Sequence, residues 1–206
     1  MGFVQEDPVT HTGQHIDANQ LAHTFSITLP EKDIAAVKGW KFNINTGDIT
    51  ITNTTKVSLL WCKNNENYDL MCDTFIYNIG TSTGGTGDWL VDVVLNPTAG
   101  DIITNTNDCQ VPGSDVESNQ NTGSTNTLSG LFYKGAQGET ALSGGRGETI
   151  LTRASGASRA VISLGGLVIA KGGSVGFNFT PAASNSSVTV QFAIACHLRH
   201  PDVVAS

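Results

Sequence analysis

The stretch from Ser174 to Leu198, SVGFNFTPAASNSSVTVQFAIACHL, has the clearest periodicity in the chain. On both sides of a short segment rich in Pro, Ala, Ser and Asn, apolar residues occupy every second position, at Val175, Phe177, Phe179, Val188, Val190, Phe192, Ile194, Cys196 and Leu198. Because the side chains of a β-strand point alternately to opposite faces, a period of two predicts strands that each bury one face. We therefore predict one long hairpin whose tip, Thr180–Ser187, is a turn and not a ligand site.

Shorter alternating runs recur along the chain and predict further strands. The runs that begin at Trp40, Phe75 and Trp89 each place apolar residues on one face. We interpret residues 46–48, Thr-Gly-Asp, as the turn of a hairpin that follows the run at Trp40. Residues 31–39, which end in glycine, form the one helical candidate, and we expect no more than a single turn. About eight or nine short strands with almost no helix predict an all-β fold, a jelly-roll-like antiparallel β-sandwich with long loops and extended terminal arms.

Length and composition support this fold class. Of the 206 residues, 39% are hydrophobic and 14% are charged, and there are 23 glycines. This composition is too apolar for a disordered chain and too poor in charge for a typical helical protein. Threonine suits the pleated strand, and asparagine and glycine accept the backbone angles of turns. A chain of this length is able to bury a substantial core in one large β domain.

The net charge of −7 at pH 7 is unevenly distributed. Residues 1–117 contain 15 acidic residues and 5 lysines, a net charge of −10, whereas residues 118–206 contain 6 basic and 3 acidic residues, a net charge of +3. Coulomb repulsion from phosphate disfavours nucleic-acid binding by the first part, and the second part has no basic stripe. We expect no nucleic-acid partner. The asymmetry either favours head-to-tail packing of like subunits or is chance.

Changes in composition suggest how the chain is organised. Residues 1–20 show no sustained period and are predicted to form an extended N-terminal arm, followed by a β-sandwich domain over residues 21–198. Within it, residues 105–130 are rich in Asn, Thr, Ser and Gly and are predicted to form a long polar loop or a linker between two lobes. Residues 199–206 are predicted to form a C-terminal tail.

The chain carries no signal for a membrane. Its first ten residues, MGFVQEDPVT, lack the basic and apolar regions of a signal peptide, and no apolar run approaches eighteen residues. We expect synthesis in a host cytoplasm and no membrane partner. The four cysteines, Cys62, Cys72, Cys109 and Cys196, show no CxxC spacing and are predicted to be reduced, with a bond between Cys62 and Cys72 as the alternative.

Candidate chemistry in the sequence is weak. The segment GGSVG at 172–176 matches the nucleophile elbow of hydrolases, but an alternating strand follows where that motif needs a helix, so Ser174 is interpreted as a turn residue. The histidine pairs His11/His15 and His197/His200 lack the neighbours that zinc sites require. Three tryptophans, Trp40, Trp61 and Trp89, are in phase with inward strand faces, so core packing is favoured over a sugar-stacking platform. We predict no catalytic residue, no cofactor and no metal, and hence no enzyme.

The closing segment, GGLVIAKGGSVGFNFTPAASNSSVTVQFAIACHL, covers residues 165–198. This order of a strand, a short tip and a long final strand resembles the closing strands of small β-sandwich virion proteins of tailed bacteriophages. These are the capsid decoration (cement) proteins and the head domains of fibres. The resemblance implies a homotrimer located in the virion, which binds the major capsid protein on the outside of an icosahedral shell at three-fold positions and stiffens the shell. It implies no catalytic residues.

The function expected from these observations is that of a non-enzymatic virion structural protein, most specifically a capsid decoration protein. One alternative is a receptor- or carbohydrate-binding head of a phage fibre, with loops 81–87 and 119–129 as the site. Another is a single jelly-roll capsid protein, against which the lack of a basic interior arm counts.

Three groups of contact residues are predicted for these functions. The candidate capsid-contact arm comprises Phe3, Val4, His11, His15 and Ile16. The candidate residues for oligomer packing are Phe177, Phe179, Phe192, His197 and His200. The candidate exposed loop contacts are Thr83, Thr86, Asn121, Thr125 and Arg146.

Overall fold

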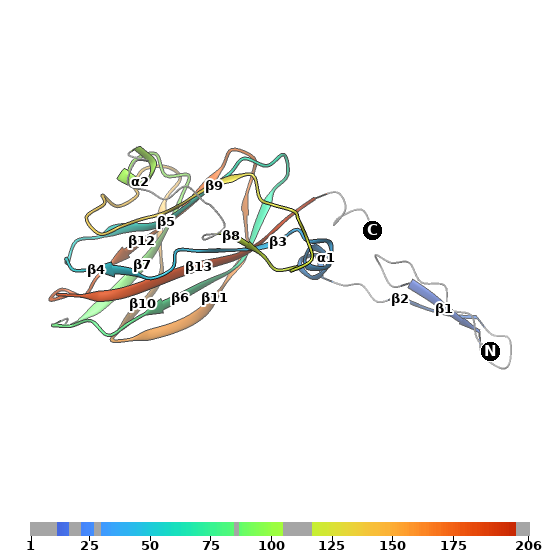
Figure 1. The fold of residues 1–206 in the computed structure, drawn as a ribbon, viewed down its shortest axis with the longest axis horizontal. Coiled ribbons are helices and arrows are strands. Elements are labelled where there is room, and N and C mark those ends of the chain that lie inside the picture. The colour runs from blue at the N-terminus through green and yellow to red at the C-terminus, as the bar shows by residue number, and fades with distance from the viewer. Residues whose placement is uncertain (1–11, 17–21, 27–29, 85–86, 105–116, 201–206) are drawn as a thin grey trace.

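The computed structural model describes residues 12–16, 22–26, 30–84, 87–104 and 117–200. The strands from residue 41 onward form two stacked antiparallel sheets (Figure 1). One sheet has the strand order β11-β6-β13-β3-β8, with β4 also paired to β13, and is called the β13 sheet here. The other has the order β10-β7-β12-β5-β9 and is called the β12 sheet. The strands are β3 Lys41–Asn45, β4 Ile49–Ile51, β5 Val57–Asn64, β6 Leu70–Ile79, β7 Asp88–Leu95, β8 Glu117–Asn119, β9 Gly130–Lys134, β10 Glu148–Ser155, β11 Ser158–Ile169, β12 Ser174–Thr180 and β13 Val188–Leu198.

The path of the chain through the two sheets is that of a jelly roll. Apart from β8 and β9, the chain changes sheet at every connection from β4 to β13 except the one between β7 and β10. Four strands of each sheet thereby take the orders β11-β6-β13-β3 and β10-β7-β12-β5. This is the arrangement of a double-sheet jelly roll, in which strands that are distant in sequence become neighbours. The prediction of an all-β, jelly-roll-like sandwich is confirmed.

The predicted hairpin at 174–198 is wrong, although both of its strands exist. β12 pairs with β5 and β7, whereas β13 pairs with β6, β3 and β4, so the two strands lie in opposite sheets. The seven residues 181–187 carry the chain across the sandwich, over the roughly 10 Å that separates stacked sheets. Alternation predicts which side chains are buried, but two strands that face one core from opposite sides show the same alternation as a hairpin.

The predicted hairpin turn at residues 46–48 is also wrong. β3 and β4 both pair antiparallel with β13, at residues 193–197 and 188–190 respectively, so they are two halves of one strand. Between them the Thr46 N–H donates to the Phe192 carbonyl over 2.9 Å, and the Phe192 N–H donates to Thr46 Oγ1 over 3.0 Å. The threonine hydroxyl thus takes the place of a backbone acceptor while Gly47, with φ 64°, interrupts the strand.

The main core lies between the two sheets and is rich in phenylalanine. Phe75 of β6 stacks on Phe177 of β12 with ring centroids 4.6 Å apart and meets Phe192 of β13 edge-on at 5.0 Å. All three side chains are fully buried. Cys62, Cys72 and Cys196 are buried and form no disulfide, so the alternative of a bond between Cys62 and Cys72 is wrong.

A second, smaller core covers the outer face of the β12 sheet. The segment 96–147, between β7 and β10, lays helix α2 (Asp101–Thr104) and further residues over that face. The buried side chains of this cluster are Trp61, Val94, Ile102, Tyr133 and Leu142. Trp61 therefore packs in this outer cluster, stacked on Tyr133 at 5.4 Å, and not in the core between the sheets as its alternation suggested.

Helix α1, Glu31–Lys38, lies beside β3 at one end of the sandwich (Figure 1). It is longer than the single turn expected, and Gly39 ends it in the left-handed conformation, with φ 75°. The strands β1 (Thr12–Ile16) and β2 (Ala22–Ser26) pair with each other and with neither sheet of the sandwich. The rest of the predicted N-terminal arm, residues 105–116 of the polar loop and residues 201–206 of the tail lie outside the described residues.

Candidate functional site

The two sheets differ in what covers their outer faces. The described part of segment 96–147 covers the outer face of the β12 sheet, where Asp92, Val94 and Asn178 are buried. No described segment forms such a layer over the central rows of the outer face of the β13 sheet, where Asn78, Arg159 and Val161 are exposed. We therefore treat this open face of the β13 sheet as the candidate functional site.

Strand register arranges the open face in three rows of side chains that cross the sheet. The rows are Arg159–Asn78–Gln191, Val161–Ile76–Ala193–Asn45 and Ser163–Thr74–Ala195–Asn43. Each of these residues alternates with an inward-facing one, because successive side chains of a strand point to opposite faces. Arg159 is the one charged residue in the three rows. Val161, in the second of these rows and on the edge strand β11, is 65% exposed.

The face is hollowed at the central strand. A groove of about 410 Å³ is lined by Asn43, Asn45, Ile76, Asn78, Arg159, Gln191 and Ala193. Ala193 lies opposite Ile76 on one side and Asn45 on the other, and its single methyl group is shorter than either neighbour. A small residue on the central strand between longer side chains on its neighbours produces the hollow.

The chemistry of the groove is that of side-chain amides. Gln191 Nε2 donates to Asn45 Oδ1 over 3.3 Å, and Gln120 Nε2 donates to Asn43 Oδ1 over 2.8 Å. Asn78 and Arg159 form no side-chain hydrogen bond or ion pair with any described residue, so their donors face solvent. The lining contains no carboxylate, and among the described residues no group of His, Cys, Asp and Glu could hold a metal ion. The groove can therefore contact peptide or hydroxyl groups but is not built for a cation.

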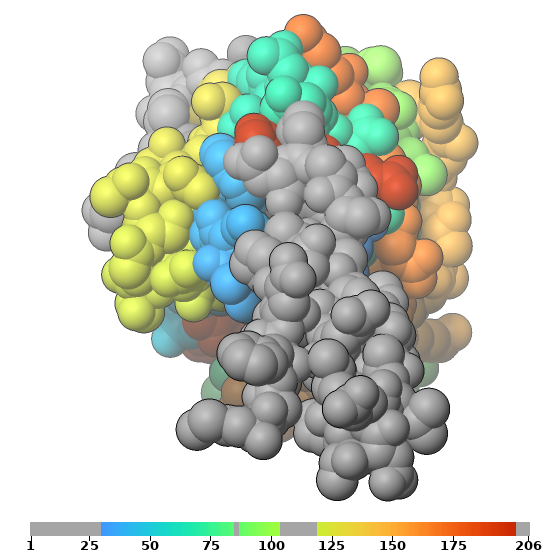
Figure 2. Space-filling model, turned by 90° about the vertical axis from the view of Figure 1, so that its right-hand side faces the viewer, coloured from blue at the N-terminus to red at the C-terminus, as the bar shows by residue number. Residues whose placement is uncertain are grey.

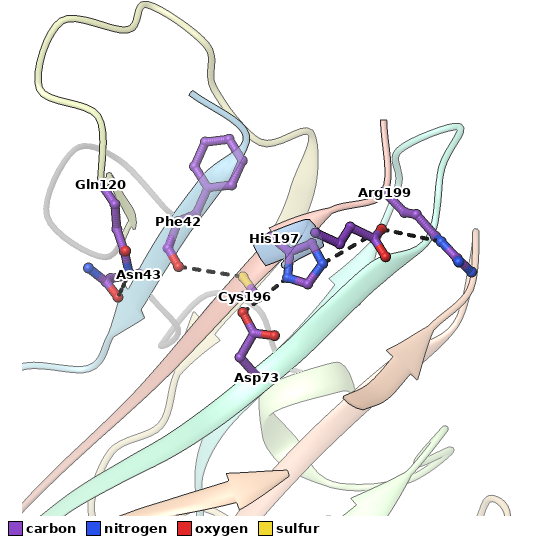
Figure 3. Close-up of polar contacts among 8 residues, drawn as sticks. Phe42, Asn43, Asp73, Gln120, Cys196, His197 and Arg199 are labelled. Atoms are coloured by element: carbon purple, nitrogen blue, oxygen red, sulfur yellow. Dashed lines mark hydrogen bonds and ion pairs between the residues drawn. The ribbon is translucent and has the colours of Figure 1, made fainter. Parts of the chain in front are cut away.

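A buried polar cluster lies at the end of β13, next to the open face (Figure 3). His197 is 4% exposed, and its Nδ1 lies 3.0 Å from Asp73 Oδ2 of β6. On the other side of the ring, Nε2 lies 3.8 Å from Glu31 Oε1 of α1, which in turn lies 3.3 Å from Arg199 Nε. The cluster thus links β6, β13, α1 and the residue that follows β13.

A second groove, of about 460 Å³, lies where β7 and β11 end and β12 begins. Its lining includes Leu95, Arg146, Val168 and Lys171. The backbone N–H groups of the glycine turn there are already used, because Gly172 donates to the Asn64 carbonyl and Gly173 to the Ala170 carbonyl, each over 2.8 Å. This groove therefore lacks the free backbone donors of an anion site.

The three phenylalanines that were predicted to pack between subunits lie inside a single chain. Phe177, Phe179 and Phe192 are each 0% exposed in the core between the two sheets of one chain. Another copy of the chain cannot reach them, because their packing partners belong to the same sandwich. His197 is buried in the polar cluster described above. His200 stacks on Trp40 with ring centroids 4.4 Å apart and meets Tyr68 edge-on at 4.9 Å.

The predicted loop contacts are spread over the molecule. Thr83 forms a bridge with Ser187, just before β13 begins, whereas Asn121 Nδ2 donates to the Val37 carbonyl of α1, near the end of β13. A strand of 11 residues separates these two ends by about 30 Å. Figure 2 shows the second end, with segment 119–130 (yellow) beside the blue surface that includes α1. Thr125 is exposed near Asn121, and Arg146 lines the second groove, so these residues form no single site.

The predicted capsid-contact arm is only partly described. Phe3, Val4 and His11 lie outside the described residues, as does Thr86 of the loop group. His15 and Ile16 belong to β1, where their backbones pair with His23 and Ala22 of β2.

The residues of the open face were missed at the sequence level. The apolar positions of each alternating run predict the core. The polar positions between them, which include Asn43, Asn45 and Gln191, were not predicted to form a site. A usable signal was present, because these positions hold amides and alanines where a solvated strand usually carries Lys or Glu.

No family model matches the chain, and no curated protein matches it. A solved structure of the VP2 subviral particle of infectious bursal disease virus is 14% identical with a TM-score of 0.22, over 93% of this chain and 47% of that chain. A structure of the Gx strain of the same virus is 14% identical with a TM-score of 0.21, over 100% of this chain and 49% of that chain. The chain thus spans about half the length of these structures. At TM-scores this low the likeness carries no argument about function.

Neither helix of the described chain has the length or the apolar composition needed to cross a bilayer.

Proposed function

We propose that this protein is a non-enzymatic structural protein of a virion that works by packing against other subunits. The observation that carries the proposal is the open face of the β13 sheet. Its rows contain one charged residue, Arg159, together with the 65% exposed Val161, whereas the chain itself covers the outer face of the β12 sheet over its central strands. Depletion of charge around exposed apolar residues is typical of the buried centre of a subunit interface.

Within this class we propose a capsid decoration protein that binds the outside of a shell as a homo-oligomer. The resemblance of residues 165–198 to phage decoration proteins implies a homotrimer and the major capsid protein as the partner. The jelly roll supports the proposal because a sandwich with one covered and one open face offers a neighbour a single broad surface. The virion is then the place where the protein acts.

The test compares two matched substitutions at exposed β-branched residues. Val161→Asp places a carboxylate on the open face, and Ile150→Asp places one at a residue 60% exposed on β10 of the other sheet. Analytical ultracentrifugation measures the oligomer, and co-sedimentation with shells assembled from the major capsid protein measures binding. We expect V161D to weaken the oligomer, shell binding or both by tenfold or more, because burying an unpaired charge is costly. We expect I150D to leave both unchanged.

The outcomes separate the two levels of the proposal. Loss of the oligomer in V161D with I150D unaffected supports an assembly face on the β13 sheet. Loss of shell binding with the oligomer intact assigns the face to the capsid partner. A monomer that binds no shell, or equal behaviour of the two variants, would overturn the assembly role.

A neutral carbohydrate is the second candidate partner, because the amides of Asn43, Asn45, Asn78 and Gln191 offer both donors and acceptors to hydroxyl groups. Stacking on aromatic rings, which sugar sites commonly use, has little support here. Among the described residues the one exposed aromatic side chain is Tyr68, 36% exposed and packed on His200. Retention on a glycan array that is lost in Gln191→Ala would favour this function over assembly.

A further inference from the structure

The polar cluster around His197 has a hydrogen-bond arrangement that only one protonation state of the ring can complete. His197 is 4% exposed on the outer face of β13, between β6 and α1. Its Nδ1 lies 3.0 Å from Asp73 Oδ2, and a carboxylate can only accept, so Nδ1 carries a proton and donates. This contact uses one of the two ring nitrogens in either charge state.

The other ring nitrogen faces a second carboxylate. In a neutral imidazole whose proton is on Nδ1, Nε2 is an acceptor, and it points at Glu31 Oε1, which is also an acceptor, over 3.8 Å. Both of these atoms are buried, and neither has a hydrogen-bond partner among the described residues. In the imidazolium, Nε2 carries a proton and can donate to Glu31. The two acceptors are then replaced by an ion pair at 3.8 Å, and a small approach of Glu31 makes it a charge-assisted hydrogen bond.

The remaining charged groups near the ring do not replace this bond. Arg199 Nε lies 3.3 Å from Glu31 Oε1, which is within ion-pair range, and its side chain is half exposed. Lys41 of β3 lies opposite His197 in the strand register and forms no ion pair with a described residue. With His197 neutral, the cluster of Asp73, Glu31 and Arg199 carries a net charge of −1, and protonation of the ring brings it to zero.

Helix α1 depends on such polar links because it buries little apolar surface. Its buried side chains are Ile34 and Ala35, and Val37 is 71% exposed. Other bonds attach the end of the helix, from Asn121 Nδ2 to the Val37 carbonyl and from Asn126 Nδ2 to the carbonyls of Lys38 and Gly39. The beginning of the helix, at Glu31, is the part that faces His197.

We propose that His197 is a protonation-dependent clasp that fastens the beginning of α1 to β13 and β6. The clasp is closed when the imidazole is charged and is weakened when the ring loses its proton. Because the stabilisation belongs to the charged form of the ring, the beginning of α1 is held more firmly at acidic than at alkaline pH.

Hydrogen exchange of the α1 amides tests the proposal in the full-length protein. Protection factors, corrected for the intrinsic pH dependence of exchange, are measured at pH 5.5 and pH 8.0. In the wild type we expect protection of residues 34–38 to fall about tenfold at the higher pH, as the loss of a hydrogen bond to a charged group would produce. Protection of β13 amides should change little, which shows that the rest of the fold is intact.

Two conservative variants on the same helix distinguish the clasp from a general effect of charge. In Glu31→Gln the side-chain amide can donate to the neutral Nε2, so α1 should stay protected at pH 8.0 and lose its pH dependence. Asp33→Asn removes one carboxylate from α1 as well but lies in no contact with the ring, so the wild-type pH dependence should persist. Equal protection of wild-type α1 at both pH values, or equal effects of E31Q and D33N, would overturn the proposal.

Discussion

At the scale of single residues, a glycine in the sequence GGSVG serves packing and not catalysis. Gly176 of β12 faces outward, and Leu142 of the covering segment lies directly on it. The neighbouring Asn178 fastens the same leucine, because Leu142 N–H donates to Asn178 Oδ1 over 2.8 Å and Asn178 Nδ2 donates to the Leu142 carbonyl over 2.9 Å. The strand therefore requires a residue without a side chain at the point where the second core docks.

Replacement of Gly176 by alanine is expected to loosen this contact. A Cβ at Gly176 would lie 2.0 Å from Leu142 Cδ1, so the covering segment must shift. We expect Gly176→Ala to lower the free energy of unfolding by about 1–3 kcal/mol, measured by urea denaturation, as overpacking of a filled site does. Gly123→Ala is the control, since its Cβ would meet nothing closer than Asn121 Oδ1 at 3.6 Å. A neutral G176A would show that Leu142 is not held there.

The buried thiols are expected to be inert in the folded protein. Burial raises the pKa of Cys72 to about 12, with the charge of Asp73 adding to the effect. Burial likewise raises the pKa of Cys62 well above its ordinary value, and the nearby Cys72 adds to that. Since the thiolate is the reactive form, both cysteines should resist iodoacetamide at pH 8.5 and react after unfolding, as mapped by mass spectrometry. Rapid modification of either one in the native state would contradict this packing.

At the scale of elements, the strand formed by β3 and β4 depends on one hydroxyl at its interruption. Thr46 is 2% exposed, and its Oγ1 accepts from the Phe192 N–H and donates to the Gly47 carbonyl over 2.8 Å. This side chain completes the hydrogen-bond ladder of β13 at the one place where the neighbouring backbone departs from it. The interruption is thus a stable part of the sheet.

Loss of the Thr46 hydroxyl should therefore be costly. Thr46→Val keeps the shape of the side chain but leaves the buried Phe192 N–H without its acceptor. We expect a loss of about 1–3 kcal/mol in the free energy of unfolding. Thr50→Val, at an exposed residue of β4, changes the same group in the same strand and should stay within about 0.5 kcal/mol of wild type. Similar values for T46V and T50V would show that water replaces the bond.

At the scale of the whole molecule, the outer faces of the two sheets differ in how far the chain covers them. Segment 96–147 supplies a second core to the β12 sheet and also adds strand β8 to the edge of one sheet and β9 to the edge of the other. The open face of the β13 sheet carries amide, hydroxyl and small apolar side chains and the single charge of Arg159. A chain with a net charge of −7 places little of that charge on these rows.

This distribution of charge predicts how assembly should respond to salt. Salt screens exposed charges, with a Debye length of about 10 Å at 0.1 M, but changes contacts between uncharged surfaces little. If the open face is the subunit interface, the dissociation constant of the oligomer should change by less than about threefold between 50 and 500 mM NaCl, measured by sedimentation equilibrium. A change of tenfold or more would point to charged surfaces elsewhere on the molecule as the interface.

Prediction from the sequence succeeded where burial depends on local alternation. Val175, Val190 and Ile194 were expected inside and are fully buried. The partner strands of β12 and β13 were not predictable in the same way, because an alternating strand has the same pattern whichever strand it pairs with. The candidate site was missed for a related reason. Asn45, Gln191 and Ala193 lie far apart in the sequence, and only the sheet register places them side by side.

The sequence by itself determined the class of fold and the inward side of most strands, because a period of two and the backbone preferences of Thr, Asn and Gly act over a few residues. It also predicted that Ser174 is a turn residue and not a nucleophile, and the structure places it as the first residue of β12. Only the tertiary structure decided that 174–198 crosses from one sheet to the other, that 46–48 interrupts a single strand, and that His197 meets carboxylates from β6 and α1. Those outcomes depend on which distant segments share a core, and that is a property of the packed chain as a whole.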